Sequence, residues 1–169
     1  QIDSESLKDY IAGMVICNDV SARDIMFGAS FFQWFKGKSQ RSFCPTGPFF
    51  YWLDSDEIDC IFNLELKLTV NGEVRQQANT SQLIHRPEKV LSELSQQIDL
   101  KAGDLLLTGT PGGVIAQNTP KSFKAFTTLL INDKERRAAF TEDQLQHSRF
   151  LEPGDEVRIT IASPDGAIN

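Results

Sequence analysis

The feature that most constrains the fold is an alternating stretch near the middle of the chain, residues 63–80 (NLELKLTVNGEVRQQANT). Leucine and valine alternate with charged residues and threonine over residues 64–70, which is the pattern of a strand with one buried face. Asn71 and Gly72 then supply the two residues that a type I′ turn prefers. The sequence therefore predicts an antiparallel hairpin whose second strand runs through Val74.

Further strands and helices are predicted on either side of this hairpin. Apolar or alternating runs indicate strands at residues 14–17, 49–52, 105–107 and 156–161. Helices are predicted at residues 3–13, where Asp3 and Ser4 can cap the first turn, and at residues 85–98. Because most of the strands look antiparallel, the sequence predicts an α+β, β-rich fold.

Other segments have weaker patterns. Residues 25–35 are rich in aromatic side chains and fit either a helix or a loop, whereas residues 37–47 have the glycine, serine and proline content of a loop. Residues 118–150 are polar, and we expect one or two short helices there, one of them beginning near Thr141.

The length and the net charge of the chain limit the classes of function that it can have. With 169 residues the chain can build one domain with a hydrophobic core, and its net charge is −6. Binding to phosphate backbones needs clustered basic side chains, and the only cluster here is Lys134, Arg136 and Arg137, interrupted by Glu135. We interpret that cluster as a solvated helix face and expect no nucleic-acid partner.

Cysteine usage and hydropathy indicate a cytoplasmic protein. No apolar run approaches the ~20 residues that span a bilayer, and the first residues lack a signal-peptide pattern. Cys17, Cys44 and Cys60 are widely spaced and odd in number, which argues against a disulfide framework and fits a reducing compartment. With only His85 and His147 beside them, a Cys/His metal site is not expected.

The first of three loops with catalytic potential is residues 18–24 (NDVSARD). Asp19 follows a predicted strand, where a carboxylate can bind a hard cation, and Arg23 and Asp24 come within one turn of each other. The alternative is structural: Asp19 caps the next turn, and Arg23 pairs with Asp24 on the surface.

The other two loops are residues 35–48 (FKGKSQRSFCPTGP) and 105–114 (LLLTGTPGGV). Lys38 lies beside a glycine and could stabilise an enolate or oxyanion, or be a solvated loop lysine. Thr108, Thr110 and the glycines of the last loop offer hydroxyl and N–H groups to an anion. That loop lacks the Gly-Lys-Ser/Thr ending of a P-loop, so nucleotide binding is not indicated.

Together, five blocks of the sequence resemble the fumarylacetoacetate hydrolase family, in the family's order. The blocks are GMVICNDVSARD, FKGKSQRSFCPTGP, LTVNGEVRQQANTSQLI, LKAGDLLLTGTPGGV and FLEPGDEVRITI. The resemblance implies a mixed β-sandwich roll that is usually a homodimer and binds one Mg²⁺ or Mn²⁺ per active site.

The resemblance also assigns roles to individual residues. Asp19 corresponds to a metal ligand of the family, Arg23 to a substrate-binding arginine, and Lys38 to the lysine of its GKS motif. Thr110 corresponds to a threonine that contacts the metal-bound ligand oxygens. In the implied chemistry, Lys38 and Thr110 stabilise an enolate as catalytic residues, and Arg23 holds a substrate carboxylate.

The sequence departs from the family pattern in places. The family's N-terminal strands, its Glu-x-Glu metal ligands and its acid–base residues would precede Gln1, so residues 1–169 are expected to be a single partial catalytic domain. With Asp19 as the one matched ligand, this stretch alone should bind Mg²⁺ weakly and show no turnover. Met26 replaces a frequent glutamine, and residues 118–149 look like an insertion.

Several functions are compatible with the family. They are the metal-dependent hydrolysis, isomerisation or decarboxylation of a small 2-oxo or 1,3-dicarbonyl acid in aromatic catabolism, through a metal-stabilised enolate. The hydrolysis would be of acylpyruvate type and the isomerisation of 2-hydroxyhepta-2,4-diene-1,7-dioate type. The FCPTGP and NTSQLI blocks look closest to the isomerase branch. The alternative is a non-catalytic relative that serves as a binding or scaffold protein, although the four retained residues argue against it.

Overall fold

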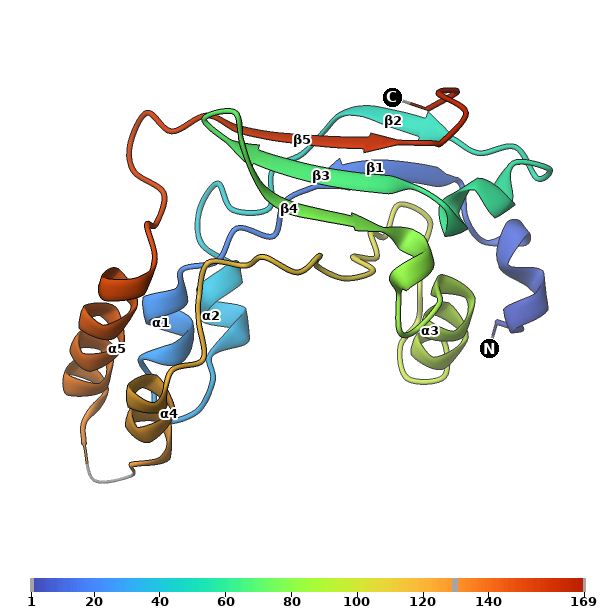
Figure 1. Ribbon diagram of the computed structural model, residues 1–169. Helices are drawn as coiled ribbons and strands as arrows, with labels where there is room; N and C mark the ends of the chain where they lie inside the picture. The colour runs from blue at the N-terminus through green and yellow to red at the C-terminus, as the bar shows by residue number, and fades with distance from the viewer. Residues whose placement is uncertain (1, 129–130, 169) are drawn as a thin grey trace. The chain divides into compact units, whose positions relative to one another are not determined.

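The computed structural model describes residues 2–128 and 131–168, which belong to two compact units (Figure 1). The first unit comprises Gln1–Ile16, Gly47–Gly113 and Glu156–Asn169, and the second comprises Cys17–Thr46 and Val114–Asp155. Each unit is therefore assembled from stretches that are far apart in the sequence.

The predicted hairpin is confirmed and forms the centre of the first unit. Strands β3 (Glu65–Val70) and β4 (Glu73–Asn79) pair antiparallel. Asn71 and Gly72 have φ values of 52° and 81°, the positive values that a type I′ turn requires. Strand β5 (Val157–Ala162) pairs antiparallel with the other edge of β3, which gives the order β4-β3-β5 and confirms the predicted last strand.

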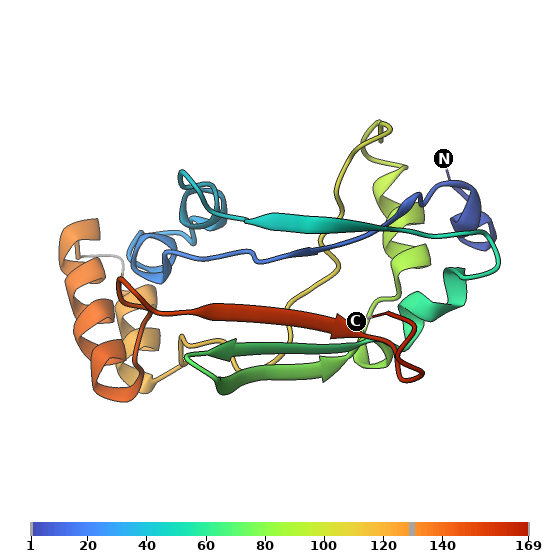
Figure 2. The same ribbon diagram turned by 90° about the horizontal axis from the view of Figure 1, so that it is seen from above.

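A second, two-stranded sheet joins β1 (Gly13–Cys17) and β2 (Thr46–Trp52). The N–H of Leu53 donates to the carbonyl of Ala12 at a distance of 3.1 Å just outside the pair, as expected for antiparallel strands. Figure 2 shows this sheet beside the three-stranded one, with the axes of the strands roughly aligned.

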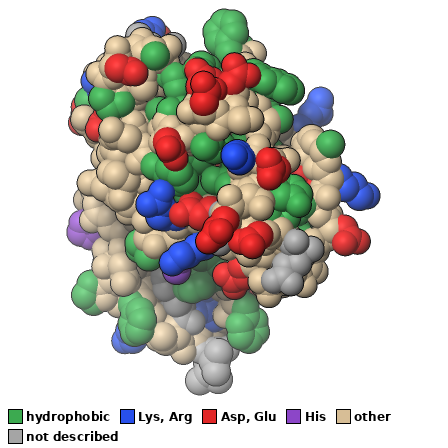
Figure 3. Space-filling view, turned by 90° about the vertical axis from the view of Figure 1, so that its right-hand side faces the viewer, with side chains coloured by type: hydrophobic (Ala, Val, Ile, Leu, Met, Phe, Trp, Pro, Cys, Tyr) green, Lys and Arg blue, Asp and Glu red, His purple; other side chains and the backbone are tan. Residues whose placement is uncertain are grey.

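The hydrophobic core of the first unit lies among three short helices. These are η1 (Ser4–Asp9), η2 (Ile58–Phe62) and α3 (Pro87–Leu94), and a one-turn η3 (Thr80–Gln82) follows β4. Leu7, Leu53, Ile61 and Leu91 are buried together. The face of this unit that carries η1 and η2 displays acidic side chains intermixed with hydrophobic ones (Figure 3).

Most of the helical residues lie in the second unit. Its helices are α1 (Arg23–Phe27), α2 (Trp34–Lys38), α4 (Pro120–Thr127) and α5 (Asp133–His147). Thr119 caps α4 by accepting a hydrogen bond from the N–H of Ser122 at 3.0 Å. Asn132 caps α5 by accepting one from the N–H of Glu135 at 3.0 Å. These caps define where the helices of residues 118–149 begin.

Arg136 fastens α5 to the end of α4. Its side chain is fully buried and donates to the carbonyl of Thr128 at 2.7 Å, to that of Ile131 at 3.3 Å, and to that of Ala125. The guanidinium thereby satisfies carbonyl groups at a helix end that have no partner within the helix. The interpretation of this basic cluster as a solvated face is wrong for Arg136.

Some predictions of local structure are wrong. Helix α5 begins at Asp133 rather than near Thr141, because Asn132 caps its first turn. Residues 105–107 form no strand, since they have no ladder partner among the described residues, and the three leucines are partly exposed. Residues 3–13 form a 3₁₀ helix followed by the start of β1 rather than one α-helix.

The arrangement as a whole confirms the α+β class, here with small antiparallel sheets. Helices and sheets are interleaved along the chain, and the helical segment of residues 118–149 lies between the third loop and β5. In the described part of the chain, no helix combines the length and apolar character needed to cross a bilayer.

Candidate active site

The loop that carries Asp19 is held against the end of α2 by backbone hydrogen bonds. The N–H of Ala22 donates to the carbonyl of Gly37 at 2.9 Å, and the N–H of Asn18 donates to the carbonyl of Pro45 at 3.1 Å. These bonds connect residues 18–22 to both ends of the segment that contains Lys38. The loop and the lysine therefore meet through main-chain geometry before any side-chain contact is considered.

Gly37 allows this close approach. It is buried, and a Cβ atom added to it would lie 2.8 Å from the Cβ of Met26 and 3.2 Å from the carbonyl oxygen of Ala22. A larger residue would push α2 away from α1. Lys38 is the last residue of α2, so the prediction that it lies in an irregular loop is wrong, although its position beside a required glycine is confirmed.

The ammonium group of Lys38 has three acceptors on this loop. It forms an ion pair with the carboxylate of Asp19, and it lies 3.1 Å from the Oγ of Ser21 and 3.5 Å from the carbonyl oxygen of Asp19. The side chains of Lys38 and Asp19 are 31% and 29% exposed. The site is thus a half-buried positive charge at a fixed position that a small ligand can still reach.

Arg23 lies in the same unit and is electrostatically coupled to this pair. Burial lowers the pKa of its guanidinium, and the negative charge of Asp19 opposes that change. One guanidinium nitrogen lies 3.7 Å from the sulfur of Met26, and the guanidinium carbon lies 5.9 Å from the ring centre of Phe27. Arg23 makes no ion pair with any carboxylate in the described residues, so its fork of N–H donors is suited to an incoming carboxylate.

The alternative pairing of Arg23 with Asp24 is not observed. Asp24 instead accepts two hydrogen bonds from Arg137 of α5, one of them from Nε at 2.7 Å. The signal for this contact is weak in the sequence, because the two residues are 113 positions apart. The helical segment of residues 118–149 therefore contacts the helix that begins with Arg23.

Cys17 and Cys44 flank the same loop as free thiols. Burial raises the pKa of the Cys17 thiol above its usual value, and the neighbouring Cys44 and Asp19 raise it further. A raised pKa keeps Cys17 in its neutral form, so it adds no negative charge beside Asp19.

Thr110 belongs to the first unit, whereas the other three predicted site residues belong to the second. Its loop is fixed to β4: the side-chain amide of Gln76 donates to the carbonyl of Pro111 at 2.8 Å. A Cβ atom on Gly113 would lie 2.2 Å from the carbonyl oxygen of Arg75, which requires glycine there. Thr110 is exposed, and the structure brings together Asp19, Arg23 and Lys38.

A divalent cation fits these residues only in part. Mg²⁺ and Mn²⁺ prefer several oxygen ligands, and Asp19 offers a carboxylate at the end of a strand. Within residues 2–128 and 131–168, no three His, Cys, Asp or Glu side chains lie close enough together to hold a metal ion. Asp19 therefore fits as one ligand of a larger set that the described residues do not complete.

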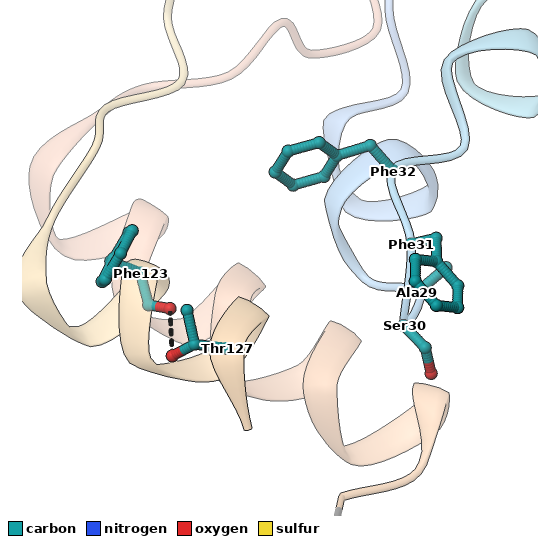
Figure 4. A pocket seen from close by; sticks show the side chains of 6 residues that line it. All are labelled: Ala29, Ser30, Phe31, Phe32, Phe123 and Thr127. Atoms are coloured by element: carbon teal, nitrogen blue, oxygen red, sulfur yellow. Dashed lines mark hydrogen bonds between the residues drawn. The ribbon is translucent and has the colours of Figure 1, made fainter. Parts of the chain in front are cut away.

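An apolar pocket of about 280 Å³ lies elsewhere on the second unit (Figure 4). It is lined by Ala29, Ser30, Phe31, Phe32, Phe123 and Thr127. None of the predicted site residues lines it, and its polar atoms are few. The pocket separates α4 from the segment after α1 and does not belong to the charged site.

Comparisons with known proteins identify the family. The C-terminal domain of fumarylacetoacetate hydrolase matches residues 1–167. The chain is 40% identical over 114 residues to the mitochondrial oxaloacetate tautomerase FAHD2A of Bos taurus, covering 68% of this chain and 36% of that protein.

Comparison with solved structures supports the same family. A probable 2-hydroxyhepta-2,4-diene-1,7-dioate isomerase of Mycobacterium abscessus has a TM-score of 0.72 and 29% identity, covering 96% of this chain and 50% of that one. A 5-carboxymethyl-2-hydroxymuconate delta-isomerase of Mycobacterium smegmatis has a TM-score of 0.65 and 30% identity, covering 95% and 47%. The chain thus spans half or less of the length of these relatives. Its sequence motifs, its fold and its charged loop cluster agree with one assignment: the chain belongs to the fumarylacetoacetate hydrolase family, in the C-terminal region of that domain.

Proposed function

We propose that the intact protein isomerises or tautomerises a small 2-oxo or 1,3-dicarbonyl acid through an enolate. The observation that carries this proposal is the half-buried ammonium of Lys38, held by Asp19 and Ser21 in the same unit as Arg23. C–C hydrolysis and decarboxylation use the same enolate, and they are the other reactions open to this site.

Lys38 is suited to stabilise developing negative charge. A general base takes the proton from the carbon beside a carbonyl group, and the electron pair of the C–H bond forms the enolate. The protonated base then returns the proton to another atom, which gives the isomer. A positive charge already fixed near the carbonyl oxygen needs no reorganisation at that moment. Removal of one such group typically costs about 100- to 1,000-fold in kcat.

Arg23 and Thr110 would bind the rest of the substrate. The guanidinium of Arg23 can hold a carboxylate through two parallel hydrogen bonds, and the role that the family resemblance gives to Thr110 is contact with an oxygen of the bound ligand. A bound Mg²⁺ or Mn²⁺, with Asp19 as one ligand, would supply Lewis-acid polarisation of the substrate's carbonyl oxygens. Divalent-metal dependence and a homodimeric assembly are parts of this proposal.

The relatives favour isomerisation over hydrolysis. The names of the similar proteins include an oxaloacetate tautomerase, a probable 2-hydroxyhepta-2,4-diene-1,7-dioate isomerase and a 5-carboxymethyl-2-hydroxymuconate delta-isomerase. Both reactions move a proton between carbon and an enol oxygen or a conjugated carbon, and both substrates carry carboxylates that suit Arg23. A role in the breakdown of aromatic compounds is part of this proposal.

The test is a substrate screen on the intact protein. Enol and keto forms of oxaloacetate, a 2-hydroxymuconate-type diene acid and an acylpyruvate would be offered with Mg²⁺, with Mn²⁺ and with a chelator, and followed by ultraviolet absorbance. We expect turnover of at least one dicarbonyl acid that the chelator abolishes. Absence of turnover on every substrate with either metal would favour the non-catalytic binding or scaffold role instead.

A further inference from the structure

Ser21 lies in the charged loop of residues 18–24, and its hydroxyl is not among the groups proposed to hold the metal or the substrate. Its hydroxyl has two contacts: it donates to the carbonyl oxygen of Asp19 at 2.9 Å, and it accepts from the ammonium of Lys38 at 3.1 Å. The first contact uses the one hydroxyl proton, so the lone pairs are turned toward the lysine. The orientation of this hydroxyl is therefore set by the loop itself.

This geometry excludes a nucleophilic role for Ser21. A serine activated by lysine must give its proton to a neutral amine. Lys38 instead pairs with the carboxylate of Asp19 and lies within hydrogen-bond distance of the Ser21 hydroxyl and the Asp19 carbonyl oxygen. The hydroxyl proton points at the Asp19 carbonyl rather than at the lysine. Ser21 and Lys38 consequently form an oriented donor–acceptor pair, not a catalytic dyad.

We infer that Ser21 is a positioning residue that fixes the ammonium of Lys38 for enolate stabilisation. This inference rests on the proposed function. The Cα end of Lys38 is anchored because the neighbouring Gly37 carbonyl accepts from the N–H of Ala22 at 2.9 Å. The stem between the two ends has four carbon atoms and rotates freely in the absence of contacts. Asp19 alone fixes one direction of the ammonium, and Ser21 supplies the second.

The test is a double-mutant cycle in the intact protein. Ser21→Ala should lower kcat by about three- to tenfold, the value of one hydrogen bond of typical strength, with little change in KM. Ser21→Thr keeps the hydroxyl and should restore kcat. In the Lys38→Ala background, Ser21→Ala should have no further effect, because there is no ammonium left to position.

A matched control separates this role from a structural one. Ser39→Ala removes an exposed hydroxyl from the next residue after Lys38, and it should leave kcat unchanged. If Ser21→Ala lowers kcat equally with and without Lys38, or if Ser21→Thr fails to restore it, the positioning role is wrong. If Lys38→Ala itself retains wild-type kcat, the proposed function fails instead, so the two failures are distinguishable.

Discussion

Two carboxylates, one on the loop before α1 and one in the first turn of α1, hold their cations in different ways. Asp19 pairs with Lys38, which also contacts a hydroxyl and a carbonyl, and both partners are about 30% exposed. Asp24 pairs with Arg137 through two nitrogens of one guanidinium, and these side chains are 37% and 53% exposed. The first pair positions a charge that a ligand can use, whereas the second joins two helices.

The difference follows from the chemistry of the two cations. An ammonium is a compact charge with three rotatable donors, so it can exchange one of its protein acceptors for an anion and keep the others. A guanidinium that donates through two of its nitrogens to a carboxylate has fewer donors left for a ligand, and its orientation is fixed. We therefore expect changes in the first pair to alter turnover and changes in the second to alter stability.

Lys38→Ala should have the largest effect. Loss of the fixed positive charge should lower kcat of the intact protein by about 100- to 1,000-fold, with a small change in melting temperature. Lys36→Ala is the matched control, because it removes an exposed lysine from the same short helix. Steady-state kinetics and thermal unfolding measured on both variants would check this, and equal kcat values would contradict the assignment of Lys38.

Asp19→Asn should have the next largest effect. The change keeps the shape of the side chain but removes the charge that holds Lys38, and a hydrogen bond to a charged group is worth about 1.5–3 kcal/mol. We expect kcat to fall about ten- to hundredfold and metal content to decrease. The measurements are steady-state kinetics and metal analysis of the purified protein, and unchanged values for both would remove Asp19 from the site.

Arg23→Lys should act mainly on substrate binding. Lysine keeps the charge but loses the two parallel hydrogen bonds to a carboxylate, so KM should rise about tenfold while kcat changes less. Arg41→Lys, on the exposed loop after α2, is the control. A substrate analogue without the carboxylate should be insensitive to Arg23→Lys, and an equal loss with that analogue would show that Arg23 does not bind the carboxylate.

Asp24→Asn should have the smallest effect and should leave kcat unchanged. The pair with Arg137 lies near the surface, where such pairs contribute about 0.2–1 kcal/mol to the free energy of unfolding. Arg137→Ala should cost a similar amount, and the double variant should cost no more than either single change. Urea unfolding would measure this, and a tenfold loss of kcat in Asp24→Asn would show that the two pairs do not have separate roles.

The parts that the sequence predicts correctly depend on short-range signals. The hairpin is marked by an alternation of period two and by Asn71-Gly72, and both signals act within a few residues. The gathering of Asp19 and Lys38 was implied by the family motifs rather than by pattern. Neither residues 18–24 nor residues 35–48 contain a local pattern that predicts contact between the end of α2 and residues 18–22.

The parts that the sequence misses depend on distant neighbours. Arg136 lies in a polar stretch and looks solvated, but the carbonyl groups at the end of α4 bury it. Residues 105–107 are apolar enough for a strand, yet a strand exists only beside another one. Asp24 forms its ion pair with Arg137 rather than with the adjacent Arg23, because α5 packs near α1. Each of these contacts is decided by tertiary structure.

The division into two discontinuous units has a consequence for how the chain acquires its structure. Strand β5 completes the three-stranded sheet by pairing with β3, with Val157 opposite Val70. During synthesis the β3 edge of the hairpin therefore stays unpaired until residues 118–149 and then β5 have been made. Such non-local pairing makes folding slow, and an uncovered strand edge is a site for association with other chains. We expect this protein to depend on rapid emergence of its last segment, and truncation before residue 157 to produce aggregates rather than a smaller folded protein.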